Sequence, residues 1–261
     1  MALSPVLRRY DHVLLDLDGC LWVGDEVLAG AVDAVAALRE AGKGLMFMTN
    51  NSWRSPEDLV RRLWRHGFQA SLDEVLSAGA ALQFWLAQRG GGGGAYVIGS
   101  QALVDHVAAA GLRVLNRTEF ATRADVVVAS SHERFDYAEL KIATQAVLRG
   151  AELIGVARDG TFPMPDGPWP AAGAVLAAVE AATGRRAAVT VGKPELPMYE
   201  AARDRLGPGR TLAVGDRPEV DVLGARRAGL DSALLADGEP ETEPRPTHTA
   251  ASLAALVLGG P

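Results

Sequence analysis

Residues 14–22 read LLDLDGCLW, an apolar stretch that runs into Asp16, Asp18 and Gly19. The apolar run over residues 12–17 predicts a buried strand. Side chains alternate along a strand, so Asp16 and Asp18 are expected on the same side where it ends. Two carboxylates at a dry strand end repel each other unless a cation lies between them, and hard divalent cations prefer such oxygen-rich surroundings. The alternative is a polar strand end with an Asx turn at Asp18 and Gly19.

The segments on either side of this motif predict the fold class. A helix over residues 30–41, a strand over 44–49 and a second helix from Ser55, with Pro56 at its first position, follow the first strand. Proline at the first helical position is typical of a helix start. Strand, helix, strand, helix indicates an α/β fold with a doubly wound parallel sheet, whose ligands bind beyond the carboxyl ends of the strands.

The remainder of the chain continues the alternation. Five consecutive glycines over 90–94 indicate a flexible loop, and 159–170, with four prolines and two glycines, is expected to be a turn-rich segment. Residues 237–246 are expected to form a loop. Further strands are predicted at 95–99, 125–130, 152–157, 188–192, 211–215 and 232–236, and further helices at 172–184 and 250–258.

Polar residues follow the second predicted strand. Thr49, Asn50 and Asn51 offer hydroxyl and amide groups that can donate hydrogen bonds to phosphate oxygens. The same residue types are common in ordinary loops and helix caps. On its own, therefore, this motif favours an ordinary loop over a binding site.

Two later motifs carry charge. Lys193, in VGKP, follows an apolar strand and can place a compact positive charge in a cleft, although most lysines are simply solvated. Asp216 and Asp221, in VGDRPEVDV, add two carboxylates at the same predicted edge of the sheet. The alternative for Asp221 is a cap on the next helix.

The composition restricts the class of protein. Of the 261 residues, 48% are apolar, enough to bury a full core. The net charge of −6 disfavours nucleic acid as a partner, because an acidic surface repels phosphate backbones. We expect no membrane span and no signal peptide, because long apolar runs are lacking. The single cysteine, Cys20, is typical of a cytoplasmic protein.

In this order the four motifs resemble the haloacid dehalogenase superfamily, whose pattern is D-x-D-G, then Thr or Ser, then Lys, then a final acidic motif. The T-N-N, G-K-P and G-D-x-x-x-x-D strings are similar to the branch with a type IIA cap. That branch includes p-nitrophenylphosphatases and phosphoglycolate, pyridoxal phosphate and glycerol phosphate phosphatases. The resemblance covers essentially the whole chain. It implies a Rossmann-like catalytic core over 1–78 and 188–261, and an inserted, smaller α/β cap over 79–187.

The resemblance also implies a Mg²⁺-dependent phosphatase that hydrolyses a small phosphomonoester. Asp16 would attack phosphorus and form an aspartyl-phosphate, and Asp18 would act as general acid and then general base. Thr49 and Lys193 would complete the catalytic set. The residues implied to contact phosphate or substrate are Gly19, Thr49, Asn50, Asn51, Lys193, Arg158 and Asp159. Those implied at the metal are Asp16, Asp18 through its carbonyl, Asp216, and Asp221 orienting metal-bound water.

Some positions depart from the family pattern. Val220 and Cys20 stand where threonine is common, and Arg158 and Asp159 stand where the cap usually has Asn-x-Asp. The substrate therefore stays open between glycerol phosphate, phosphoglycolate, a nucleoside monophosphate and a sugar phosphate. Cap edges often pair in this branch, which leaves a homodimer open.

Three alternative functions are consistent with the motifs. A dehalogenase of this superfamily has the first aspartate without the second, so Asp18 favours a phosphatase. A phosphomutase would retain both acids. A non-catalytic or regulatory metabolite-binding protein could keep the same fold without turnover.

Overall fold

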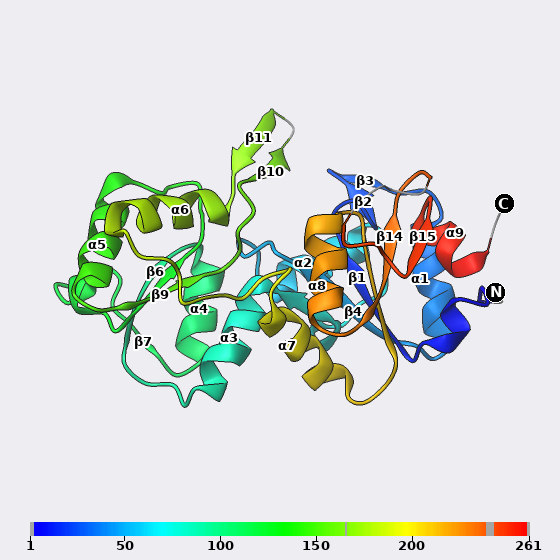
Figure 1. The fold of residues 1–261 in the computed structure, drawn as a ribbon, viewed down its shortest axis with the longest axis horizontal. Coiled ribbons are helices and arrows are strands. Elements are labelled where there is room, and N and C mark those ends of the chain that lie inside the picture. The colour runs from blue at the N-terminus through cyan, green and yellow to red at the C-terminus, as the bar shows by residue number, and fades with distance from the viewer. Residues whose placement is uncertain (1–2, 165, 239–242, 260–261) are drawn as a thin grey trace. The chain divides into compact units, whose positions relative to one another are not determined.

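The computed structural model describes residues 3–164, 166–238 and 243–259 of the chain (Figure 1). It contains two compact units. The core unit comprises Met1–Thr49, Pro56–Leu76 and Lys193–Pro261, and the inserted unit comprises Asn50–Ser55 and Ser77–Gly192. Each unit has its own parallel sheet with helices on both faces, so the predicted α/β fold class is confirmed.

The core unit is built on a six-stranded sheet. From β1 the chain adds strands first on one side of β1 and later on its other side. The order is β15 (His248–Ala250), β14 (Asp231–Leu235), β13 (Thr211–Gly215), β1 (His12–Asp16), β4 (Gly44–Thr49) and β5 (Val75–Ser77). In register, Leu15 of β1 pairs with Val214 of β13, and Asp16 pairs with Met48 of β4. The carboxyl ends of β13, β1 and β4 are therefore neighbours.

Helices cover both faces of this sheet. One face packs against α1 (Ala31–Glu40) and α9 (Leu253–Leu258), and the other against α7 (Leu196–Leu206) and α8 (Leu223–Arg227). The remaining elements are α2 (Pro56–Arg65), the 3₁₀ turns η1 (Leu7–Arg9) and η2 (Leu72–Glu74), the π-helical turn η4 (Pro218–Val222), and the hairpin of β2 (Trp22–Val23) and β3 (Glu26–Val27).

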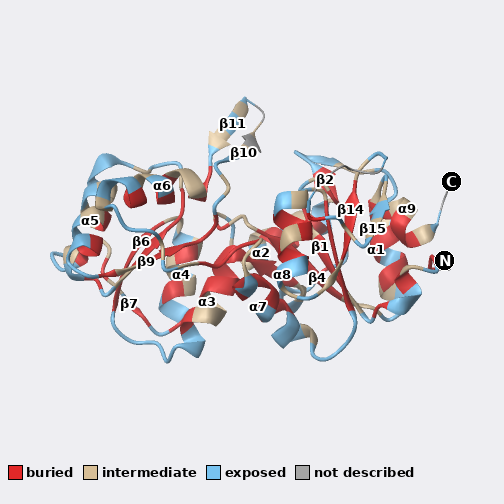
Figure 2. Cartoon of the chain, in the orientation of Figure 1, coloured by how far each residue is buried: buried red, intermediate tan, exposed pale blue. Residues whose placement is uncertain are grey.

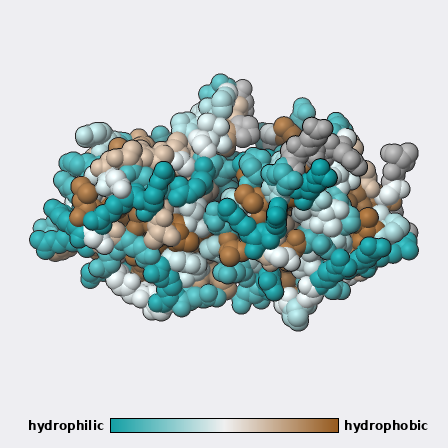
Figure 3. Space-filling view, viewed as in Figure 1, coloured by the Kyte–Doolittle hydropathy of each residue, from teal (hydrophilic) through white to brown (hydrophobic). Residues whose placement is uncertain are grey.

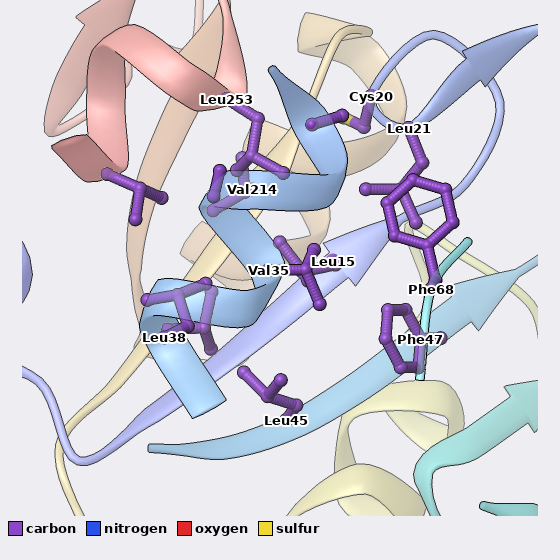
Figure 4. Packing of buried hydrophobic residues seen from close by; sticks show 14 of the residues in the cluster. Leu15, Cys20, Leu21, Val35, Leu38, Leu45, Phe47, Phe68, Val214 and Leu253 are labelled. Carbon is purple, nitrogen blue, oxygen red and sulfur yellow. The ribbon is translucent and has the colours of Figure 1, made fainter. Parts of the chain in front are cut away.

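The apolar pattern of the sequence explains the packing on the first face. Alternate β1 residues point into it, and Leu15 lies beside Val35 of α1 and Phe47 of β4 (Figure 4). Each is at most 2% exposed. Full burial of one such side chain contributes about 1.5–3 kcal/mol. This packing fixes β1, and with it the position of Asp16 at its end.

The inserted unit has a five-stranded parallel sheet between two helical layers, and its central strands are buried (Figure 2). The strand order is β12 (Val189–Thr190), β9 (Glu152–Gly155), β8 (Val126–Ala129), β6 (Gly94–Ile98) and β7 (Arg113–Val114). The helices are α3 (Ala78–Gln88), α4 (Gln101–Ala109), α5 (Tyr137–Leu148) and α6 (Ala172–Thr183), with the 3₁₀ turn η3 (Ala121–Arg123). Val127 packs with α5 and α6, and Val128 with α3 and α4, as alternation along a strand requires.

Two sequence expectations need correction. Residues 159–170 are more than turns, because β10 (Thr161–Met164) and β11 (Gly167–Pro170) form an antiparallel hairpin there. A two-stranded ribbon leaves one edge of each strand unpaired and so tolerates proline. The last helix begins at Leu253 rather than near 250, because β15 occupies His248–Ala250. Part of the predicted loop at 237–246, residues 239–242, lies outside the described residues.

Among the described residues, no helix is both long and apolar enough to cross a membrane. On the face drawn in Figure 3, hydrophobic residues form scattered patches among hydrophilic ones.

Candidate active site

The carboxyl edge of the core sheet brings together the polar residues that follow its strands. Asp16 is the last residue of β1, Thr49 is the last residue of β4, and Asp216 follows β13 directly. Thr49 is buried. Because these three strands are adjacent, the motifs predicted at separate strand ends meet at one edge.

Lys193 links two of the carboxylates. Its Nζ lies 2.7 Å from Asp16 Oδ1 and 2.7 Å from Asp221 Oδ1. Lys193 is 5% exposed and Asp221 4% exposed. The second Asp221 oxygen accepts the Arg217 backbone N–H at 3.2 Å. Asp221 therefore lies inside the π-helical turn η4 and holds the lysine, so the alternative of a helix cap does not describe it. Such π-helical turns are often found at functional sites.

Burial and neighbouring charges shift the pKa values of Asp16, Asp216 and Lys193. Burial, with Asp221 and Asp216 nearby, raises the pKa of Asp16 above its ordinary value, although Lys193 opposes the rise. Burial and Asp221 likewise raise the pKa of Asp216. Burial alone would lower the pKa of Lys193, but Asp16 and Asp221 hold it well above its ordinary value. The cluster thus contains three carboxylates and one ammonium group, which contacts two of them, so negative groups outnumber positive ones.

This arrangement fits a bound divalent cation. Asp16, Asp216 and Asp221 each offer a carboxylate oxygen, and these oxygens lie within 4.8 Å of one another. Asp216 Oδ1 is buried and has no hydrogen-bond partner among the described residues. A buried carboxylate oxygen without a donor is costly unless a cation satisfies it. Gly19 makes room for this carboxylate, since a Cβ there would lie 2.0 Å from Asp216 Oδ2.

Asp18 lies apart from that cluster. It is exposed, and its Oδ1 accepts a hydrogen bond from the indole Nε1 of buried Trp22 at 2.8 Å. The Asp18 side chain is not in the group of carboxylates that could hold a metal. Sequence reasoning missed Trp22, although it stands only four residues after Asp18.

Four of the predicted site residues belong to the inserted unit. Asn50 Nδ2 donates to Asp159 Oδ2 at 2.7 Å, and Asn51 Oδ1 accepts the Trp53 backbone N–H at 2.9 Å. Arg158 Nη2 donates to Glu180 at 3.1 Å. Asn50 and Asp159 therefore join the segment after Thr49 to the base of the β10–β11 hairpin, and Arg158 is engaged in an ion pair.

The ion pair of Arg158 yields a prediction about acid stability. Burial alone would raise the pKa of Glu180, but hydrogen bonds from Arg158, Ala187 and Arg186 lower it to about 2. The unfolded chain binds this proton more readily, so the stabilisation is complete above the ordinary pKa of 4.5 and is lost as the pH falls through about 2. Glu180→Gln should lower the free energy of unfolding by about 1–3 kcal/mol at pH 7.

Urea unfolding at pH 7 and pH 3 measures this effect. The difference in the free energy of unfolding between wild type and Glu180→Gln should be smaller at pH 3 than at pH 7. Exposed Glu133→Gln is the matched control. A difference that stays constant or grows on acidification would contradict the role of Glu180.

The fold and the site define an α/β protein with a carboxylate-rich, lysine-bridged centre at the carboxyl edge of its sheet. The model of the haloacid dehalogenase-like hydrolases matches residues 13–113, and a second model of the same kind, described as HAD-hydrolase-like, matches residues 190–256. The chain belongs to the haloacid dehalogenase-like hydrolases, in the family with a type IIA cap.

Individual relatives support this assignment. Human chronophin is 36% identical over 271 residues, covering 98% of this chain and 91% of chronophin. Sugar-phosphatase AraL of Bacillus subtilis is 30% identical, covering 87% and 83% of the two chains. The crystal structure of glycerol phosphate phosphatase from Mycobacterium tuberculosis in complex with magnesium superposes with a TM-score of 0.89 at 31% identity, covering 98% of this chain and 79% of that one.

Proposed function

We propose that Asp16 is the nucleophile with which this small-molecule phosphatase takes phosphate from a phosphomonoester. An oxygen of Asp16 forms a bond to phosphorus while the bond from phosphorus to the leaving oxygen breaks. The electron pair stays on the leaving oxygen, which takes a proton from Asp18. In the second step water attacks phosphorus and gives a proton to Asp18. The bond between phosphorus and Asp16 then breaks and releases inorganic phosphate.

The observation that carries this proposal is the contact of Lys193 with both Asp16 and Asp221, at 2.7 Å each. A buried ammonium group beside an anionic nucleophile offsets the charge that phosphate brings, and such fixed charge stabilises the transition state. Thr49, Gly19 and the amide groups after Thr49 are proposed to hold phosphate oxygens. Arg158 and Asp159 are proposed to contact the rest of the substrate.

The cofactor proposed is Mg²⁺. Asp16, Asp216 and the backbone carbonyl of Asp18 would hold it, and Asp221 would orient its water molecules. The buried Oδ1 of Asp216, which finds no hydrogen-bond partner in the described part of the chain, supports this assignment. When bound, the ion would reduce the repulsion between the carboxylates and an approaching phosphate.

A metal titration tests the proposed function. Hydrolysis of p-nitrophenyl phosphate should be lost in EDTA and restored by Mg²⁺. Asp216→Asn should raise the Mg²⁺ concentration for half-maximal activity by at least about 10- to 100-fold, the loss that even removal of a residue hydrogen-bonded to a metal ligand causes. Mg²⁺ at 100 times its Kd should also stabilise the metal-free protein by about 2.7 kcal/mol, and less in the variant. Full activity in EDTA would refute the cofactor assignment.

Several finer features are part of the proposal. The two domains are proposed as residues 1–78 with 188–261, and 79–187. We propose a small phosphorylated metabolite as substrate and leave open the phosphomutase alternative, which analysis of the product distinguishes.

A cytoplasmic location is supported by the one buried, free cysteine among the described residues, Cys20. A homodimer is supported by β7, an outer strand of the inserted sheet.

A further inference from the structure

The hydrogen bond between Trp22 and Asp18 has a chemical consequence for the proposed reaction. The indole Nε1 donates to Asp18 Oδ1 at 2.8 Å. Trp22 has no exposed surface, whereas Asp18 is exposed. A carboxyl group that faces solvent is therefore held by a donor that is itself fixed within the core unit.

The surroundings of Trp22 fix its ring. The His66 ring lies 5.2 Å away at an interplanar angle of 36°, and Phe68 meets the indole edge-on at 6.1 Å. The guanidinium carbon of Arg62 lies 4.6 Å from the ring centroid, in the geometry of a cation–π contact. Arg62 belongs to α2, and His66 and Phe68 belong to the segment directly after it, so one continuous stretch of the chain packs around the indole.

Backbone contacts also join the segment around Asp18 to Trp22. The Gly19 N–H donates to the Trp22 carbonyl at 2.8 Å, and Asp18 and Trp22 form an isolated bridge. Both ends of the side-chain hydrogen bond are therefore held by the main chain. A hydrogen bond between fixed groups loses little conformational entropy when it forms, and it restricts the rotamer of the carboxyl group.

We propose that Trp22 is a positioning residue that assigns different tasks to the two oxygens of Asp18. This inference rests on the proposed function, in which Asp18 exchanges a proton with the leaving group. Oδ1 accepts the indole N–H, so Oδ2 is the oxygen left to exchange a proton. As the bond from phosphorus to the leaving oxygen breaks, the electron pair on that oxygen takes the proton from Oδ2. In the second step Oδ2 receives a proton from the attacking water.

Loss of the Trp22 hydrogen bond should have different effects on the hydrolysis of two esters of nearly the same shape, phenyl phosphate and p-nitrophenyl phosphate. Phenolate, whose conjugate acid has a pKa of about 10 as in tyrosine, leaves poorly without a proton. The nitro group of p-nitrophenolate withdraws charge, so this anion leaves with little help. Loss of a correctly placed acid should therefore slow phenyl phosphate hydrolysis more than p-nitrophenyl phosphate hydrolysis. A loss of packing alone should slow both equally.

The experiment compares kcat/KM for the two esters, with Mg²⁺ present, in wild type and Trp22→Phe. The variant removes the N–H and keeps an aromatic ring. We expect kcat/KM for phenyl phosphate to fall about 10-fold more than for p-nitrophenyl phosphate, a part of the 10²–10⁴-fold that general acid catalysis contributes. The selective loss should lie in kcat rather than KM, because the substrate's own contacts are unchanged.

Two further variants separate positioning from packing. Phe68→Leu disturbs the same ring but leaves the N–H of Trp22 in place, so any loss should be equal for both esters. Adding Trp22→Phe to Asp18→Asn should produce no further selective loss, because the residue that Trp22 positions is already removed. If Trp22→Phe does not fold, 3-benzothienylalanine in place of Trp22 keeps the ring shape and replaces the N–H by sulfur.

The outcomes distinguish the inference from the proposed function. Equal losses for both esters when the N–H is removed would overturn the inference and leave the phosphatase function standing. A selective loss that persists in the Asp18→Asn background would overturn it as well. If wild type with Mg²⁺ hydrolyses neither ester, the proposed function and the inference are overturned together.

Discussion

Replacing Asp16 by asparagine should reduce turnover of p-nitrophenyl phosphate by about 10⁴-fold or more, the scale seen when a covalent nucleophile is removed. Asparagine keeps the size of the side chain but has no anionic oxygen to attack phosphorus. The remaining groups can still bind phosphate, so KM should change much less than kcat. A steady-state assay with Mg²⁺ in excess measures both quantities.

The control for this experiment is another aspartate of the core unit. Asp33 is exposed on α1, and Asp33→Asn should keep wild-type activity. A second measurement asks whether the phosphoryl group is attached to Asp16. Wild type that is stopped in acid during turnover should carry a phosphate that hydroxylamine releases, and Asp16→Asn should carry none. Substantial activity in Asp16→Asn would refute the nucleophile assignment.

The fold could be predicted from local patterns because its strands are short, apolar and regularly spaced. The predicted strands at 44–49 and 211–215 match β4 and β13 residue for residue. The rule that parallel strands present ligands at their carboxyl ends then placed Asp16, Thr49 and Asp216 at one edge. The hairpin of β10 and β11 was not predictable in the same way, because prolines at 163, 168 and 170 conceal the alternation of a strand.

The details of the site depend on contacts that local patterns do not contain. Asn50 and Asp159 are 109 positions apart in the sequence, and their hydrogen bond depends on how the inserted unit folds. Arg158 is expected to contact substrate, and the sequence gives no sign of its pairing with Glu180, which depends on the packing of α6. The Trp22–Asp18 bond depends on two side-chain rotamers. Residue types and strand ends were therefore predictable, whereas the partners of each side chain were not.

Replacing Lys193 by methionine should affect stability and activity together. Lys193 is the ammonium partner of both Asp16 and Asp221 in a buried site. Methionine fills a similar volume and leaves the two carboxylates facing each other. Breaking a buried ion pair from one side costs about 3–5 kcal/mol, so the metal-free variant should unfold at a clearly lower urea concentration. Loss of the fixed charge should lower kcat about 10²–10³-fold.

The response to Mg²⁺ separates this explanation from general damage to the fold. Removing a competing positive charge makes the carboxylate cluster more negative, so Mg²⁺ should raise the Tm of Lys193→Met by more than it raises that of wild type. Activity should stay low even when stability is recovered, because a metal ion cannot replace an ammonium group beside Asp16. Exposed Lys141→Met, on α5, should change neither property. A Lys193→Met protein with unchanged Tm and full activity would show that the lysine bridge between Asp16 and Asp221 does not organise the site.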